Sequence, residues 1–145
     1  MFRNKSKNIE SAILQIAAQH MRPLLIALSL VVLYRGHNEP GGGFIGGLML
    51  GAAYILYAMA FGVIKTQKTI FFKPVNLTAF GLLLALISGT PALLAGHIFM
   101  TGEWITLFPG MIMELKLGTP LIFDVGVYFT VAGMLMLVMF SIMEE

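Results

Sequence analysis

Four long apolar runs constrain this chain more than any single motif does. They cover residues 11–34, 43–64, 74–99 and 119–143, with polar connectors between them. The third run is interrupted by Gly89-Thr90-Pro91, where a break in the helix is expected. A helix needs about 20 mostly apolar residues to cross a bilayer. The chain is 58% hydrophobic and only 11% charged, too little polar surface for a soluble domain of 145 residues. Because a transmembrane barrel would show short alternating segments instead, the sequence predicts an all-α integral membrane protein with four transmembrane helices.

Basic residues gather in two segments that we expect on the same side of the membrane. They precede the first run and fill the connector between the second and third runs, as Arg3, Lys5, Lys7, Lys65, Lys68 and Lys73. By the positive-inside rule both segments are cytoplasmic, and four crossings then place the C-terminus in the cytoplasm as well. We see no internal repeat, so residues 1–145 are expected to form a single membrane domain.

The same composition excludes several function classes. The net charge of +2 is split between two membrane flanks, so no nucleic-acid partner is expected, whereas membrane lipid is. The chain has no cysteine, which excludes disulfides and thiolate metal sites. We expect no metal and no cofactor.

The segment 35–51 carries a glycine pattern at the start of the second helix. Gly43, Gly47 and Gly51 are spaced four residues apart, and Gly42 and Gly46 repeat that spacing. In an apolar helix this pattern makes a flat strip on which another helix backbone can pack closely. A phosphate-binding loop would need a following Lys and Ser or Thr, which this segment lacks. The packing partner is left open between the first helix, the third helix and a neighbouring subunit.

The polar part of this segment precedes those glycines and has two interpretations. Its residues are Arg35, His37, Asn38 and Glu39, followed by Pro40. A turn of this composition is ordinary between two helices. Alternatively, His37 and Glu39 contact protons, ions or a partner, since a histidine exchanges protons near neutral pH. One His and one Glu are too few ligands for a metal site.

Asp124 is the one acid inside a predicted span, about one turn into the last helix. It either stabilises the helix end or an intersubunit contact, or it takes part in ion conduction. His97 lies at the outer end of the third run, where a structural role at the interface is expected. The centres of the last three helices contain no Lys, Arg, Asp or Glu, which favours an accessory subunit over a self-contained ion transporter.

Two further segments have an amphipathic character. Gln15, Gln19 and Arg22 share one face of the first helix, and they either pack against a partner protein or reach the lipid headgroups. The connector 100–118 carries Trp104 and is expected to lie along the outer membrane surface.

Two stretches resemble a known family. Arg35-Gly36-His37-Asn38, with Pro40 to Gly47 after it, is similar to the signature of the MnhB family, one of the subunit families of Mrp-type multisubunit cation/proton antiporters. The run from Gly118 to Tyr128 resembles the last helix of that family. The similarity extends over all four predicted helices.

The resemblance implies a subunit of a bacterial cell-membrane complex that exchanges sodium for protons, supporting pH homeostasis and sodium tolerance. Its partners would be the other subunits of the Mrp-type complex, which together handle Na+ and H+. The resemblance implies no catalytic residue and no enzyme activity. Three alternatives remain: a subunit that lines the ion path through Asp124, the related subunit of a membrane-bound hydrogenase, and an autonomous transporter that acts as a homo-oligomer.

The predicted topology leads to a direct test. A reporter that is active only in the cytoplasm, fused after Met143, should be active, because four crossings return the chain to the side of its basic residues. The same reporter fused within the connector 100–118 should be inactive. External readout from the first fusion would overturn the four-helix topology.

Overall fold

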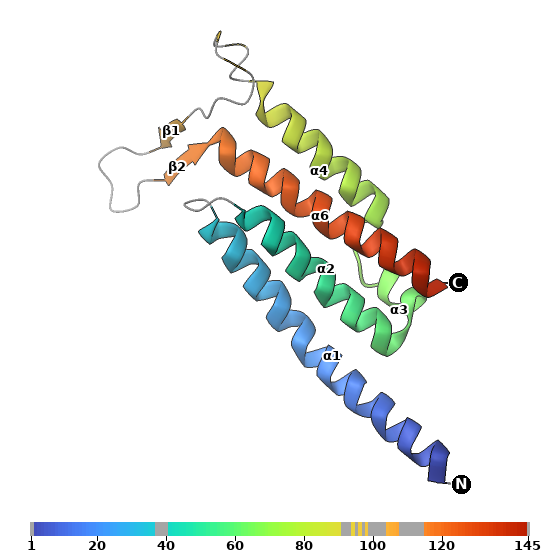
Figure 1. Cartoon of the computed structure of the whole chain (residues 1–145). Helices are drawn as coiled ribbons and strands as arrows, with labels where there is room; N and C mark the ends of the chain where they lie inside the picture. The colour runs from blue at the N-terminus through green and yellow to red at the C-terminus, as the bar shows by residue number, and fades with distance from the viewer. Residues whose placement is uncertain are drawn as a thin grey trace.

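A computed structural model describes most of the chain as a bundle of helices with a small hairpin at one end (Figure 1). The described residues are 2–36, 41–90, 94, 96, 98, 104–107 and 115–144.

The helices and strands follow one another in a simple order. Their bounds are α1 (Phe2–Arg35), α2 (Gly42–Phe61), α3 (Val63–Gln67), α4 (Pro74–Ser88), β1 (Trp104–Leu107), β2 (Leu115–Gly118) and α6 (Thr119–Glu144). Among the described residues, three helical segments are long and apolar enough to cross a membrane: Ser11–Arg35, Gly42–Phe61 and Thr119–Glu144. The apolar helix α4 is shorter.

The long helices lie side by side in the order α1, α2, α6, α4 (Figure 1). The last helix of the chain therefore lies in the interior of the bundle, between α2 and α4. Helix α1 reaches past the others at its N-terminal end (Figure 1). Position along the chain does not give this order, because α6 lies between α2 and α4, which follow one another in the sequence with only the short α3 between them.

Glycine and proline set several helix ends. Gly62 has a φ of 89°, so the second helix ends at Phe61 rather than at residue 64, and the short α3 follows as a separate helix. Pro74 occupies the first turn of α4, where its missing N–H is tolerated. Helix α4 ends at Ser88 with Gly89 as its C-cap, at the predicted interruption of the third run. Most of residues 91–99 lie outside the described residues.

The connector 100–118 contains two strands that the sequence pattern did not predict. Strands β1 and β2 pair antiparallel, with Trp104 opposite Gly118 and Leu107 opposite Leu115. The predicted all-α class is therefore correct for the membrane helices but omits this hairpin. Each strand has only four residues, too few for an alternating pattern to be distinguished from a short apolar run.

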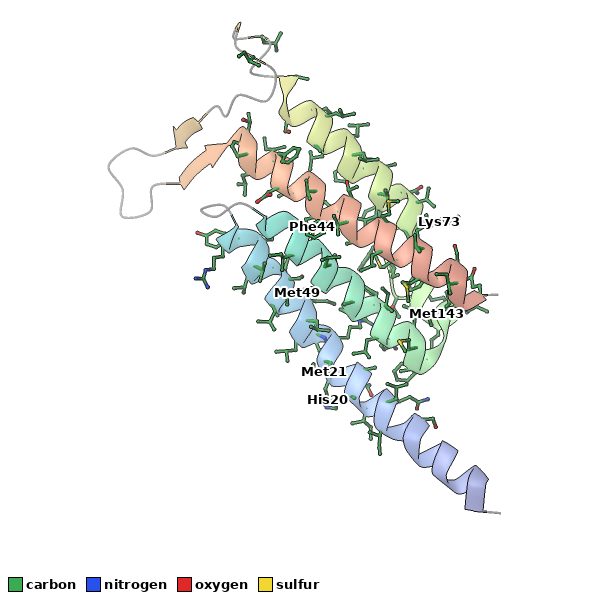
Figure 2. All side chains as sticks on the ribbon, in the orientation of Figure 1. His20, Met21, Phe44, Met49, Lys73 and Met143 are labelled. Atoms are coloured by element: carbon green, nitrogen blue, oxygen red, sulfur yellow. The ribbon has the colours of Figure 1, made fainter. Side chains whose placement is uncertain are left out.

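The packed interior is small, and it lies where α2, α3 and α6 meet. Its buried members are Ala58, Val63, Ala132, Met136 and Phe140. Many large apolar side chains instead point outward from the bundle (Figure 2), among them Leu24, Phe44, Phe80, Leu86 and Ile142. An apolar exterior over a small-residue interior is the distribution expected where lipid, rather than water, surrounds the helices.

Helices α4 and α6 meet through a second set of glycines, which the sequence pattern did not single out. A Cβ atom at Gly126 would lie 2.7 Å from the backbone nitrogen of Ala85, and one at Gly133 would lie 2.7 Å from that of Thr78. A Cβ at Gly81 would lie 2.6 Å from the carbonyl oxygen of Gly126. Since real Cβ atoms do not approach so closely, this contact requires glycine on both helices.

This contact yields a stability prediction. Replacing Gly126 by Val should force α4 and α6 apart and destabilise the protein by about 1–3 kcal/mol, the usual cost of overpacking. Met134→Val on the same helix is the control, because Met134 is 56% exposed. Thermal unfolding in detergent should show a lower midpoint for Gly126→Val alone. Equal midpoints for the two variants would contradict the close contact.

Candidate functional site

The predicted glycine strip of α2 lies between α1 and α6. A Cβ at Gly47 would lie 2.7 Å from the carbonyl oxygen of Tyr128, and one at Gly51 would lie 2.7 Å from Leu135 Cδ2. A Cβ at Gly43 would overlap the carbonyl group of Asp124. The neighbours of these three glycines within the chain are thus on α6, the last helix, and not on the third predicted helix.

The two ends of the polar connector after α1 come together. Gly36 follows the last turn of α1, and a Cβ there would overlap the backbone of Gly42, the first residue of α2. Gly41 caps α2 with a φ of 100°, a backbone conformation that residues other than glycine rarely adopt. The chain therefore reverses direction within a few residues, which brings α1 and α2 together along their length.

Gly46 lies beneath a buried hydrogen bond that joins α1 to α6. Ser29 Oγ and Tyr128 OH are 2.9 Å apart, and these residues are 0% and 2% exposed. Ser29 Oγ also donates to the carbonyl oxygen of Ile26 at 2.7 Å. Its single hydrogen is thereby used, so Tyr128 OH donates to Ser29 Oγ. A Cβ at Gly46 would lie 2.9 Å from the Ser29 carbonyl oxygen and 3.1 Å from Tyr128 Cδ2.

Asp124 lies at the junction of α6 with the start of α2. It is half-buried, one turn from the N-terminal end of α6, and its main-chain carbonyl contacts Gly43. Gly43 is in turn adjacent to Gly42, which contacts Gly36. The one acid of the predicted spans is therefore placed beside the ends of the polar connector.

Of the remaining predicted polar residues, the structure describes one, Arg35. Arg35 is exposed at the last turn of α1. His37, Asn38, Glu39 and His97 lie outside the described residues. In the part of the chain that the structure describes, no group of three or more His, Asp or Glu side chains is arranged to hold a metal ion.

An aromatic contact of Arg22 was missed by sequence reasoning. Its guanidinium carbon lies 4.5 Å from the ring centroid of Tyr57 and 5.2 Å from that of Tyr54. Its Nη1 donates to Thr69 Oγ1 at 3.5 Å, and Gln15 Nε2 donates to the Ala60 carbonyl oxygen at 3.4 Å. Gln15 and Arg22 thus face α2 of the same chain, and the Arg22 guanidinium stacks on tyrosine rings. The signal available in the sequence was the three-residue spacing of Tyr54 and Tyr57, which places both rings on one face of the helix.

These contacts suit helix assembly better than ion transfer. Helices α2 and α4 contain no Asp, Glu, Lys or Arg. In α6 the two acids, Asp124 and Glu144, lie near opposite ends of the helix. The described side chains therefore place no row of ionisable groups across the bundle, whereas they hold α1, α2 and α6 in close contact.

Comparison with known proteins identifies the family. Residues 13–137 match the model of a domain related to the MnhB subunit of Na+/H+ antiporter. The B-type subunit of the Na+/H+ antiporter of Alkalihalophilus pseudofirmus is 34% identical over 141 residues, which cover 96% of this chain and 98% of that protein. The Bacillus subtilis protein of the same name is 34% identical over 136 residues, covering 92% and 93% of the two chains.

A solved structure shows the same arrangement of the chain. The structure of the Mrp complex from a Dietzia species matches with a TM-score of 0.75 and 31% sequence identity. The match covers 94% of this chain but only 14% of the solved chain, so this protein spans a small part of that polypeptide's length. With the family model covering most of its length and relatives similar from end to end, this chain belongs to the MnhB family.

Proposed function

We propose that this chain is an accessory membrane subunit of an Mrp-type sodium/proton antiporter in the bacterial cell membrane. The match over 94% of the chain to part of an Mrp complex carries the proposal. The described side chains support it, because they build helix contacts rather than a row of ionisable groups across the bundle. The chain would act with the other subunits of the complex, which handle Na+ and H+, and would not act as an enzyme.

We further propose that the chain forms one MnhB-type membrane domain with four crossings and both termini in the cytoplasm. Three helices have the length and composition of membrane spans. Helix α4 lies alongside α6, which supports a further crossing, although its 15 residues measure about 22 Å against a hydrocarbon core of about 30 Å. The lysines between α2 and α4 support the cytoplasmic placement of that connector.

In this function the glycines Gly42, Gly43, Gly46, Gly47 and Gly51 serve helix contact. They let α2 approach α1 on one side and α6 on the other, so that the protein presents one rigid body to its partners. Arg35, His37, Asn38, Glu39 and His97 are proposed as contacts with neighbouring subunits at the outer membrane face.

A second candidate function is supported by the position of Asp124. A half-buried carboxylate beside the polar connector is suited to an ion path, since ionisable residues in membrane segments commonly face protein or water. The accessory role is favoured because no further acid lies deeper in α6 before Glu144.

The accessory role predicts the result of removing the chain. A strain that lacks this chain but retains the other subunits should lose sodium/proton exchange in everted membrane vesicles, because the complex loses an assembly surface. A plasmid copy should restore exchange, and native gel electrophoresis should show an incomplete complex in its absence. Full exchange activity without the chain would reject the proposal.

The two candidate roles of Asp124 predict different results for one substitution. Asp124→Asn keeps the size of the side chain and one of its acceptor oxygens but removes its charge. If the role is accessory, the variant complex should assemble and retain most of its exchange activity in vesicles. Asp124→Glu, which keeps the charge, is the matched control. Loss of exchange in a fully assembled Asp124→Asn complex, with activity kept by Asp124→Glu, would instead establish the ion-path role.

A further inference from the structure

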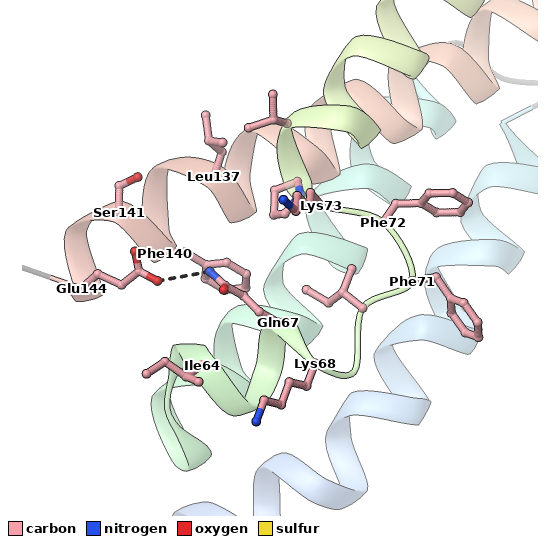
Figure 3. A pocket seen from close by; sticks show the side chains of 13 residues that line it. Ile64, Gln67, Lys68, Phe71, Phe72, Lys73, Leu137, Phe140, Ser141 and Glu144 are labelled. Carbon is pink, nitrogen blue, oxygen red and sulfur yellow. Dashed lines mark hydrogen bonds between the residues drawn. The ribbon is translucent and has the colours of Figure 1, made fainter.

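A cleft of about 690 Å³ opens beside α3 and the C-terminal end of α6 (Figure 3). These segments lie at the end of the bundle opposite the β1–β2 hairpin (Figure 1). The cleft lies between the connector that follows α3 and the last two turns of α6. The contacts of the glycine strip of α2 do not involve the residues that line this cleft.

The cleft is apolar on its walls and polar on its rim. Phe72, Val75, Leu137 and Phe140 contribute apolar walls. The polar side chains of the lining are Gln67, Lys68, Lys73, Ser141 and Glu144. Leu137 and Glu144 are seven residues apart on α6, which corresponds to about 10 Å along the helix axis. Along α6 the lining thus changes from the carboxylate of Glu144 to the apolar side chain of Leu137 within about 10 Å.

The charges around the cleft favour an anion. Lys68 and Lys73 are both exposed, and in the view of Figure 3 they lie on either side of the hydrogen bond between Gln67 and Glu144. Glu144 is the one carboxylate among the lining residues, and its Oε1 accepts that bond from Gln67 Nε2 at 3.1 Å.

A third lysine between α2 and α4, Lys65 of α3, makes a contact outside the cleft. Lys65 Nζ lies 4.6 Å from the ring centroid of Phe61, at the end of α2, and Lys65 does not line the cleft. It has the same charge as the other two and precedes Lys68 by three residues. Lys65 therefore serves as an internal control for any effect of the connector's charge as a whole.

Aromatic side chains place this connector at the membrane boundary. Phe71 and Phe72 precede Lys73 and are 97% and 65% exposed. Two exposed phenyl rings beside a lysine are unfavourable in water but are stabilised where headgroups meet acyl chains. Phe72 also lines a second hollow of about 420 Å³, which Leu77, Phe80 and Phe129 extend along α4 and α6. An apolar chain entering beside Phe72 would meet apolar walls in both hollows.

We propose that this cleft binds an anionic phospholipid. The headgroup phosphate lies between Lys68 and Lys73, and an acyl chain lies along Val75 and Leu137. A phospholipid has its anionic group and its apolar chain in the order in which the cleft presents lysines and apolar walls. A protein segment would have to combine an acidic end with an apolar end at the same spacing. Basic pockets at the cytoplasmic ends of membrane helices bind anionic headgroups in this way.

The lysines provide the first test, with the complex purified together with its partner subunits and titrated with fluorescent phosphatidylglycerol in detergent. Each of Lys68→Gln and Lys73→Gln should weaken binding about fivefold, the contribution of one lysine near an anionic headgroup. Lys65→Gln should leave binding unchanged, and phosphatidylcholine should bind weakly to all forms. The proposal would be overturned if all three substitutions weakened binding equally, or if none of them changed it.

Glu144 provides a test of opposite sign. Glu144→Gln keeps an acceptor for Gln67 but removes the one carboxylate among the described lining residues, so phosphatidylglycerol should bind about fivefold more tightly. A merely structural role of these residues would not produce tighter binding. Unchanged or weaker binding would contradict the proposal.

A photo-crosslinking phosphatidylglycerol keeps the test independent of whether the variants assemble. In the wild-type complex it should label peptides that contain Phe72 or Leu137. Labelling confined to other regions would overturn the proposal, as would a photo-crosslinker placed at Phe72 that captures a neighbouring subunit and no lipid. None of these readouts measures transport, so their failure is distinguishable from failure of the proposed antiporter function.

Discussion

The close approach of α6 to both of its neighbours is the constraint on which the rest of the bundle depends. Lipid tails are as apolar as leucine, so membrane helices gain little from burying large apolar side chains against one another. They associate instead by close van der Waals contact. Gly47 and Gly51 allow α2 to reach α6 from one side, and Gly81 and Gly126 allow α4 to reach it from the other. Many large apolar side chains are left on the outside of the bundle.

Polar contacts specify which helices meet and at which position along their axes. The bond from Tyr128 to Ser29 joins α1 to α6 above Gly46, where a side chain on α2 would separate them. Further toward the N-terminus of α1, Arg22 stacks on Tyr54 and Tyr57 of α2. The first contact acts in the dry interior, where an unsatisfied hydroxyl would be costly, and it therefore penalises a slipped register. A protein held rigid in this way is suited to assembling a larger complex.

Much of the candidate site could be predicted from sequence spacing, and the remainder required distances. The glycine repeat indicated a helix contact because a fixed spacing of four marks one helix face whatever lies opposite. Its partner helix could not be deduced, since any helix of the bundle could supply an apolar surface. The Ser29–Tyr128 bond joins residues 99 positions apart, and a lone serine in an apolar run carries no signal of its partner. The cleft beside Lys68 and Lys73 likewise exists only because the C-terminal end of α6 lies next to α3.

The sequence by itself determined the class of protein and the family. Long apolar runs can be satisfied only as membrane helices, because each helix bonds its own backbone groups internally. The motif from Arg35 to Gly47 pointed to MnhB, which the family match over residues 13–137 confirmed. Only the tertiary structure decided that α6 lies between α2 and α4, that α2 ends at Phe61, and that a hairpin precedes α6. Helix periodicity records which face of a helix is small or polar, whereas the choice of neighbour depends on how all faces pack at once.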